Sequence, residues 1–221
     1  MLTPHHLTLL RQDLRTLAHI EYQEVENELL DHYAMLTEQK METGQVFEYA
    51  SANAWKELGE GIGLQQIQEE FIKNIRKQIS SRHLEILKSY FRWPTVIGTL
   101  FICGLVYQLS TVLGPKTIYI VTQFLFLSPG LILIYALVRK EHRHTDTRKL
   151  AWQYMNSRAN IPTAFLQFNN MLPFFLNNED KPTPFLLMHP SISTGLACVL
   201  LIYTLTFMEL YRENFSYKTA H

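Results

Sequence analysis

Hydrophobic residues follow two different patterns in the two parts of the chain. Along residues 1–92 they recur at steps of three and four positions, which is the spacing of one face of an α-helix. Farther on, they form long segments without any charged residue. The first pattern predicts helices over about 4–19, 21–43, 46–58 and 64–92. We therefore expect an all-α N-terminal part that leads into apolar segments.

Local signals mark the ends of these predicted helices. A hydroxyl at Thr3 can cap free N–H groups, and Pro4 suits a first helical position, where the missing N–H costs nothing. Gly44 and Gly59 suit the ends of the second and third helices. The run 59–63 lacks the spacing of a phosphate-binding loop, so we interpret it as a flexible connection. The expected apolar faces are, helix by helix, Leu7, Leu10, Leu14 and Leu17; Val25, Leu29, His32 or Tyr33, and Leu36; Phe47, Ala50, Ala54 and Leu58; then Leu64, Ile67, Phe71, Ile75 and Ile79. The fourth helix is expected to run on through Leu84 and Leu87.

Long uncharged segments indicate an integral membrane protein. Residues 93–115, 117–138 and 182–208 contain no Lys, Arg, Asp or Glu. A hydrocarbon core about 30 Å thick requires about 20 apolar residues in a helix. Together with the charge-free stretch 159–178, these segments predict a four-helix transmembrane bundle with spans at about 93–113, 117–138, 159–178 and 185–208. The third span is the least apolar of the four, and a re-entrant or interfacial segment is the alternative there.

The distribution of charge divides the chain and predicts its orientation. Residues 1–72 carry 4 basic and 13 acidic side chains and form an expected acidic domain, whereas 73–92 form a basic stalk before the membrane domain 93–221. The loop 139–158 holds six Lys or Arg residues, so the positive-inside rule places it, and both termini, on the cytoplasmic side. The stalk is expected to meet anionic lipid headgroups through Lys73, Arg76, Lys77, Arg82, Lys88 and Arg92.

Composition and motifs exclude several classes of protein. A formal net charge of zero argues against nucleic-acid binding, which requires a basic face. Cys103 and Cys198 both lie in apolar segments and do not form a disulfide scaffold. We find no Gly-x-Ser-x-Gly or His-Glu-x-x-His motif, and we expect no catalytic site, metal or cofactor. His142, His144 and Asp146 have ligand chemistry for zinc, but we interpret their segment as a solvated basic loop.

A known bacterial module has a similar pattern within the acidic domain. The run Glu28-Leu29-Leu30-Asp31-His32 is followed by a Gly that ends the helix and by a second helix that carries alanines and closes on Leu-Gly. Residues 20–72 in this respect resemble the HAAS-type signalling domain, a helical domain that precedes membrane spans and is related to permease-prefix domains. The markers of the resemblance are Leu29, Asp31, His32, Gly44, Ala54 and Gly59; Trp55, Gly61 and Gly63 depart from the pattern.

The resemblance implies a location and a role. It implies a multi-pass protein of the bacterial cytoplasmic (inner) membrane. It also implies a regulatory or accessory, non-catalytic role, in which residues 1–72 bind a protein partner. A small transporter or channel component is the alternative.

Polar and small residues in the predicted spans supply the candidate sites of the membrane domain. Polar groups within spans are costly and therefore draw functional interest. The polar cluster comprises Gln167, Asn169, Asn170 and His189, which we interpret as glue between helices or, in the alternative, as the lining of a path. Small residues permit close packing within the protein or in a homo-oligomer, and these are Gly98, Gly104, Ser191 and Gly195.

Overall fold

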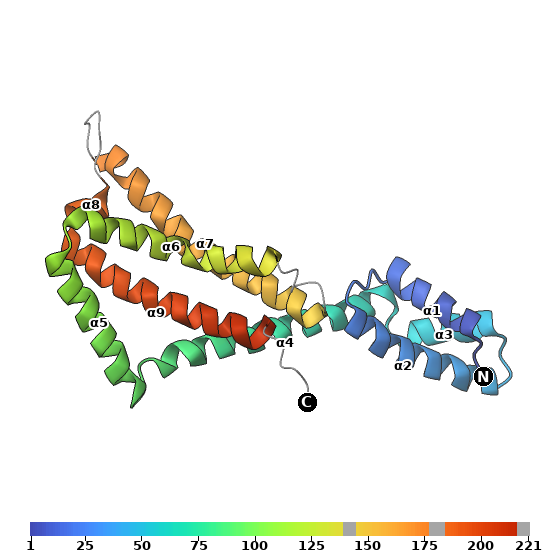
Figure 1. The fold of residues 1–221 in the computed structure, drawn as a ribbon. Helices are drawn as coiled ribbons and strands as arrows, with labels where there is room; N and C mark the ends of the chain where they lie inside the picture. Colours follow the sequence, from blue (N-terminus) through green and yellow to red (C-terminus); the bar gives the residue numbers. More distant parts are fainter. Residues whose placement is uncertain (139–144, 177–183, 216–221) are drawn as a thin grey trace. The chain divides into compact units, whose positions relative to one another are not determined.

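The computed structural model describes residues 1–138, 145–176 and 184–215, and every regular element in these ranges is an α-helix (Figure 1). The predicted all-α class is therefore confirmed for the described part of the chain. The residues divide into two compact units, Met1–Arg76 and Lys77–His221. Helix α4, Glu60–Ser89, supplies residues to both units.

The first unit consists of α1 (Pro4–Thr16), α2 (Gln23–Glu42), α3 (Phe47–Glu57) and the first turns of α4. The predicted cap of the first helix is confirmed, because the Thr3 hydroxyl accepts a hydrogen bond from the His6 backbone N–H at 3.2 Å. Gly44 and Gly59 adopt φ angles of +94° and +86°, which disfavour any side chain. The core is formed by the buried residues Leu10, Leu14, Val25, Leu29, Leu30, Tyr33, Ala50, Ala54 and Leu64.

A buried carboxylate fixes α2 against α1. Glu26 is 4% exposed, and its carboxylate pairs with the guanidinium groups of Arg11 at 3.0 Å and Arg15 at 2.8 Å. The hydrogen bond to Glu26 raises the pKa of Arg15. Because an isolated buried charge is costly, this pairing makes the register of the two helices specific.

The glycines after α3 belong to a helix and not to a flexible connection. Helix α4 already begins at Glu60, which corrects our interpretation of 59–63. A methyl group on Gly61 would lie 3.1 Å from the carbonyl oxygen of Leu17, and one on Gly63 would lie 3.1 Å from that of Leu58. The glycines therefore permit the first turn of α4 to approach the backbone around it closely.

Replacing Gly61 by alanine is expected to destabilise the first unit by about 2 kcal/mol, since the neighbouring atom belongs to the backbone and cannot rotate away. Hydrogen–deuterium exchange of the full chain, resolved by peptide, would measure the loss of protection in α1 and α4. Gly98→Ala is the control, because nothing lies within 4 Å of the added methyl group. Equal protection in both variants would contradict the close approach at Gly61.

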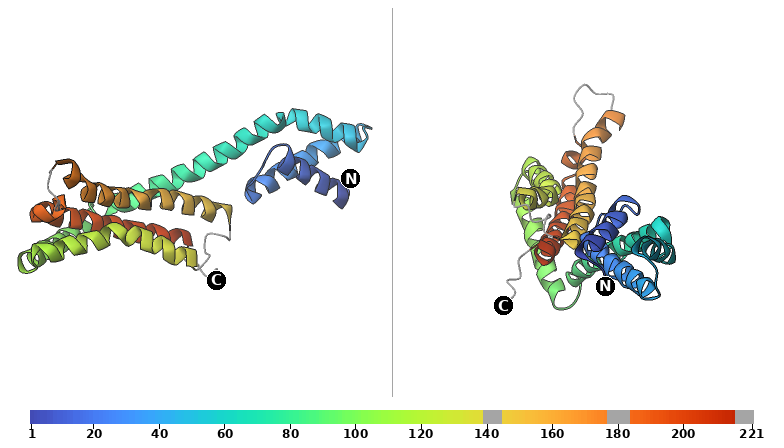
Figure 2. Two further views of the ribbon diagram at one scale, coloured as in Figure 1. Left: turned by 90° about the horizontal axis from the view of Figure 1, so that it is seen from above. Right: turned by 90° about the vertical axis from the view of Figure 1, so that its right-hand side faces the viewer.

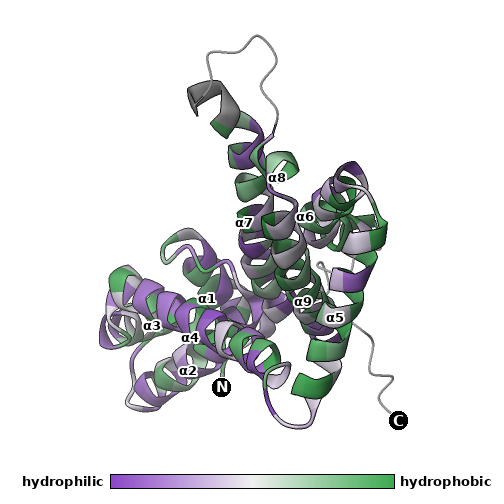
Figure 3. Cartoon of the chain, turned by 90° about the vertical axis from the view of Figure 1, so that its left-hand side faces the viewer, coloured by the Kyte–Doolittle hydropathy of each residue, from purple (hydrophilic) through white to green (hydrophobic). Residues whose placement is uncertain are grey.

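The second unit contains α5 (Thr95–Val112), α6 (Pro115–Val138), α7 (Asp146–Leu176), the short α8 (Phe185–Met188), α9 (Pro190–Phe215) and the last turns of α4. Helices α6, α7 and α9 lie side by side in Figure 1 and in the view from above (Figure 2, left). Three helices of the described residues, α5, α6 and α9, are long and apolar enough to cross a membrane. Figure 3 shows the contrast between the hydrophobic α5 and the mainly hydrophilic α4.

Hydroxyl pairs join α6 to α9 and reveal the direction of the two helices. The side chains of Thr122 and Ser193 lie 3.2 Å apart, and those of Ser128 and Thr204 lie 2.6 Å apart. Both residue numbers increase together, so α6 and α9 run parallel. Helix α7 runs antiparallel to them, because Tyr119 near the start of α6 donates to Asn170 near the end of α7 at 3.1 Å.

Two predicted boundaries in the membrane domain are wrong. Residues 146–158, expected as a loop, are the first turns of the 31-residue helix α7. The segment 185–208, expected as one helix, is interrupted at His189, whose ψ of 77° is not helical. Proline disfavours helical geometry in the residue before it, and Pro190 follows at this point. The last helix then continues beyond the predicted end, to Phe215.

Candidate functional site: the polar junction of α4, α7 and α9

The last turns of α4 pack against α7 and α9 within the second unit. Ile79, His83 and Ile86 are buried on this face, at 7%, 7% and 2% exposure. Their steps of four and three positions are those of a single helical stripe. The predicted continuation of the fourth helix through Leu84 is confirmed, since α4 ends at Ser89. Leu84 is 50% exposed and lies five positions after Ile79, at the edge of this stripe.

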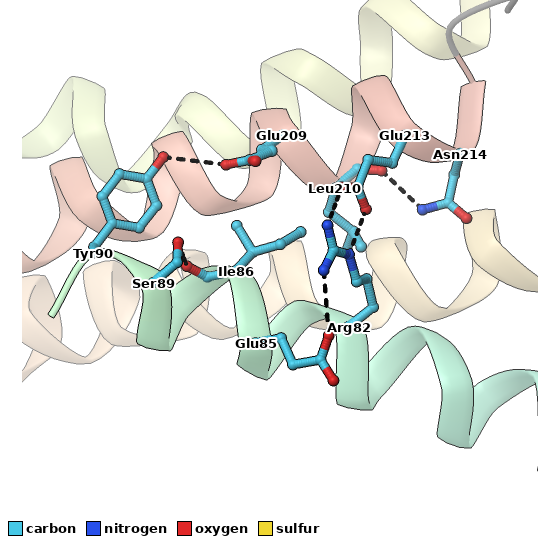
Figure 4. Close-up of polar contacts among 9 residues, drawn as sticks. All are labelled: Arg82, Glu85, Ile86, Ser89, Tyr90, Glu209, Leu210, Glu213 and Asn214. Carbon is cyan, nitrogen blue, oxygen red and sulfur yellow. Dashed lines mark hydrogen bonds and ion pairs between the residues drawn. The ribbon is translucent and has the colours of Figure 1, made fainter. Parts of the chain in front are cut away.

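Arg82 connects α4 to the end of α9. Its Nε and Nη2 atoms donate to the two carboxylate oxygens of Glu213 at 2.9 and 2.6 Å, and Nη1 lies 3.2 Å from Glu85 (Figure 4). Hydrogen bonds to the two carboxylates raise the pKa of Arg82. Two parallel bonds to one carboxylate fix the orientation of both side chains. Arg82, predicted to meet lipid headgroups, is thus engaged by carboxylates of the protein.

A second set of polar contacts lies farther along the same seam. The Tyr90 hydroxyl donates to Glu209 of α9 at 3.5 Å, and the Tyr90 carbonyl accepts a bond of 2.7 Å from the Thr99 hydroxyl of α5 (Figure 4 shows the first). Burial, together with the charge of Glu209, raises the pKa of Tyr90. The chain at the end of α4 is therefore tied to both α5 and α9.

His83 is the central buried polar residue of the junction. Its Nδ1 lies 3.1 Å from the Tyr154 hydroxyl of α7, and its ring lies 5.9 Å from the ring of Tyr203 on α9. The Arg158 guanidinium stands 5.3 Å from the Tyr154 ring, and the Arg158 carbonyl accepts a bond of 2.9 Å from Tyr203. The Nε2 atom of His83 is buried and has no hydrogen-bond partner among the described residues. Three helices thus converge on one imidazole.

Acid is expected to weaken this junction through His83. Burial, reinforced by the charge of Arg158, lowers the pKa of His83 below its usual value of 6.5. The imidazole then binds a proton more readily in the unfolded state than in the folded state. The stability that neutral His83 contributes to the second unit is therefore complete above about pH 6.5 and is lost as the pH falls below that value. We expect the melting temperature to fall more between about pH 7.5 and 5.5 in the natural protein than in His83→Phe.

The exposed His32 supplies the control for this pH dependence. His32→Phe should retain the full acid sensitivity of the melting temperature, because the His32 side chain is exposed on α2 and does not belong to the junction. An acid sensitivity that is unchanged in His83→Phe would contradict the assignment to His83.

The structure brings together two of the four residues of the predicted polar cluster. Asn169 is 7% exposed; its amide donates to Asn170 at 3.1 Å and its oxygen accepts from the Leu186 backbone N–H at 3.0 Å. Gln167 is exposed, and the ring of His189 lies 4.6 Å from the ring of Phe185 in a tilted arrangement. Asn169 thereby holds the start of α8 against α7, which is the contact expected of glue between helices.

The small residues of the predicted spans leave space around them. A methyl group added to Gly98, Gly104 or Gly195 would meet nothing within 4 Å. Ser191 and Gly195 line a groove of about 470 Å³ between α5 and α9, together with both cysteines, Cys103 and Cys198. Within the described residues, close packing at these glycines is therefore not made.

The markers of the acidic domain separate into structural and exposed residues. Leu29 and Ala54 are buried in the core, and Gly44 and Gly59 end two helices. Asp31 and His32 are exposed on α2, next to the exposed Glu28 and Met35. Of the six markers, Asp31 and His32 are the side chains that a partner can reach.

The metal ligands considered from the sequence lie largely outside the described residues. His142 and His144 are not described, and Asp146 is the first residue of α7. Among the residues that the structure does describe, no group of three His, Cys, Asp or Glu side chains is placed to hold a metal ion.

Sequence reasoning missed the buried role of His83 and the pairing of Arg82 with Glu213. The sequence did contain a signal for the burial of His83, because Ile79, His83 and Ile86 share one helical stripe. It contained no signal for the ion pair of Arg82 with Glu213, because 131 positions separate these two residues.

Comparison with known proteins gives no relative from which a role can be transferred. No family model, curated protein or solved structure matches the chain. The described residues form an all-helical fold in which three helices are long and apolar enough to cross a membrane, consistent with a membrane protein.

Proposed function

We propose that this chain is a regulatory, non-catalytic protein of the bacterial inner membrane that binds a protein partner through its acidic N-terminal unit. The observation that carries the proposal is α4. One uninterrupted helix of 30 residues contributes its first turns to the acidic unit and its last turns to the polar junction with α7 and α9. Binding of a partner at the first unit would shift the conformational equilibrium of α4, and α4 would in turn alter the packing of the membrane helices.

The directions of the helices support four membrane crossings. Helices α6 and α9 run parallel, so if both cross the membrane, the chain between them must cross back. Helix α7 is antiparallel to both and is 31 residues long, about 46 Å, which exceeds the hydrocarbon thickness of about 30 Å. This supports α7 as the third span despite its polar residues.

Charge supports an orientation with both termini in the cytoplasm. The segments 73–92 and 139–158 each carry six Lys or Arg, whereas 114–116 and 177–184 carry one each. Exposed basic residues of α4 and of the segment after it are then available to anionic headgroups, namely Lys73, Lys77, Lys88 and Arg92. The resemblance of residues 20–72 to the HAAS-type domain agrees with this arrangement.

Site-directed crosslinking of the full chain in its native membranes tests partner binding. We would place a photoreactive residue at His32 and compare two double variants. Glu28→Lys with Asp31→Lys reverses the exposed charge on α2, and the matched control, Glu69→Lys with Glu70→Lys, reverses two exposed charges on α4. We expect the first variant to reduce a specific crosslinked species at least about tenfold, because reversed charge repels a basic partner.

The control variant should retain the crosslinked species. A species that persists in both variants, or the absence of any crosslinked protein, would contradict binding through α2. The alternative of a transport path receives no support from the described residues, since Gln167 and His189 do not join Asn169 and Asn170.

A further inference from the structure

A small cavity opens beside His83 between α4, α7 and α9. Its volume is about 260 Å³, and all its lining residues belong to the second unit. One part of the lining is polar and the other is aliphatic. The polar and aromatic residues are Ser80, His83, Tyr154, Arg158 and Tyr203, and the aliphatic residues are Leu84, Leu87 and Ile161.

Three polar side chains of this cavity have unsatisfied hydrogen-bonding groups. His83 is 7% exposed, and its Nε2 has no partner among the described residues. Arg158 is exposed and Ser80 is half-buried; within the same described residues, the Arg158 guanidinium contacts the Tyr154 ring but no carboxylate, and the Ser80 hydroxyl makes no hydrogen bond. A buried polar atom without a partner, such as Nε2 of His83, is rare in native proteins and indicates an occupant that supplies one.

The missing partner has the chemistry of a phosphate. If Tyr154 donates to Nδ1, the neutral ring of His83 carries its proton on Nε2 and is a donor there. Arginine presents a fork of donors that matches phosphate oxygens, and a serine hydroxyl adds another donor. Glu85 and Glu213, the two carboxylates that Arg82 engages, do not line the cavity.

The aliphatic lining and the position along the helices indicate a lipid. Arg158 directly precedes the charge-free part of α7, where Ile161 lines the cavity. Tyr203 stands six positions before Glu209, the first charged residue of α9, which is about 9 Å along the axis. A cavity with donors on one side and leucines on the other, at the end of a span, accommodates a charged headgroup together with the start of its acyl chain.

We propose that this cavity binds the phosphate headgroup of an anionic phospholipid, with Arg158, His83 and Ser80 as donors. The site rests on the membrane crossing proposed above. It is distinct from the surface of α2 that was proposed to bind a protein. A bound lipid would cross-connect α4 and α7 at the junction, so lipid composition would regulate how firmly α4 is held.

Thermal unfolding of the purified full-length protein in a neutral detergent tests the site. We expect added phosphatidylglycerol to raise the melting temperature by about 4 °C, while phosphatidylcholine has little effect. Arg158→Gln should abolish the rise. The matched control is Arg212→Gln, which removes an exposed charge of α9 outside the cavity and should retain the rise.

A second variant keeps the test decisive if Arg158→Gln does not fold. Leu84 is 50% exposed at the rim, so Leu84→Trp should fill the cavity without disturbing the core and should also abolish the rise. An undiminished rise in Arg158→Gln or Leu84→Trp would overturn the site, and so would an equal rise with phosphatidylcholine. An equal rise with inorganic phosphate alone would assign the site to a free anion and overturn the lipid. The rise in melting temperature with phosphatidylglycerol does not depend on crosslinking at α2. Failure of the lipid site can therefore be distinguished from failure of protein binding at α2.

Discussion

Replacing Ile86 by aspartate is expected to lower the free energy of unfolding of the second unit by about 4 kcal/mol. Ile86 is 2% exposed on the buried face of α4, beside the fully buried Leu210 of α9 (Figure 4). Arg82, four positions earlier on α4, is already engaged by Glu213 and Glu85, so a carboxylate at position 86 finds no free cation to compensate for its lost solvation. We therefore expect α4 to separate from α7 and α9. Hydrogen–deuterium exchange of peptides that cover residues 77–89 and 203–215 would measure this separation.

Leu84→Asp is the control for this experiment, because it makes a similar substitution two positions earlier on the same helix. Leu84 is 50% exposed, so the new carboxylate stays solvated and the loss should remain below about 1 kcal/mol. Similar exchange in the two variants would show that α4 is not held by its buried face. The Ile86→Asp variant could lose its regulatory function and still crosslink to a partner at α2. That result would support α4 as the connection between partner binding and the helices of the second unit.

Replacing Leu14 by alanine is expected to destabilise the first unit by about 3 kcal/mol. Leu14 is fully buried in the core, where the deleted methyl groups leave a cavity that the surrounding helices fill only in part. Chemical denaturation of the full chain, followed by the fluorescence of Trp55, would measure the loss. Trp55 is a suitable probe, because its ring lies 5.7 Å from that of the buried Tyr33.

Leu17→Ala is the matched control on the same helical stripe. Leu17 is 59% exposed, and its truncation should cost less than about 0.5 kcal/mol. Equal losses in the two variants would contradict the burial pattern of α1. The sequence does not distinguish the two leucines, since both occupy the same predicted face.

The comparison of Leu14 with Leu17 shows what helical periodicity can and cannot predict. It correctly predicted α1, its Thr3 cap and the face that contains Leu10 and Leu14. It did not predict where neighbouring helices cover that face, because coverage depends on segments far away in the chain. The same limit explains why the burial of His83 was missed, because the residues that cover it come from α7 and α9.

The sequence by itself determined the elements of this protein. Helical spacing, a capping hydroxyl, helix-ending glycines and apolar segments long enough to cross a membrane are local properties, because each follows from residues within a few turns of one another. The all-α class and three apolar helices suited to a membrane were therefore predictable. The sequence did not predict that α7 begins as early as Asp146, since polar residues form a loop or a helix according to what packs against them.

Only the tertiary structure decided which of these elements meet and which side chains they bury. The ion pair of Arg82 with Glu213, the burial of His83 and the parallel course of α6 and α9 each join residues more than 70 positions apart. Such contacts depend on the packing of whole helices, and no local spacing encodes them. The polar junction that connects α4 to the membrane helices is a property of the folded chain for this reason.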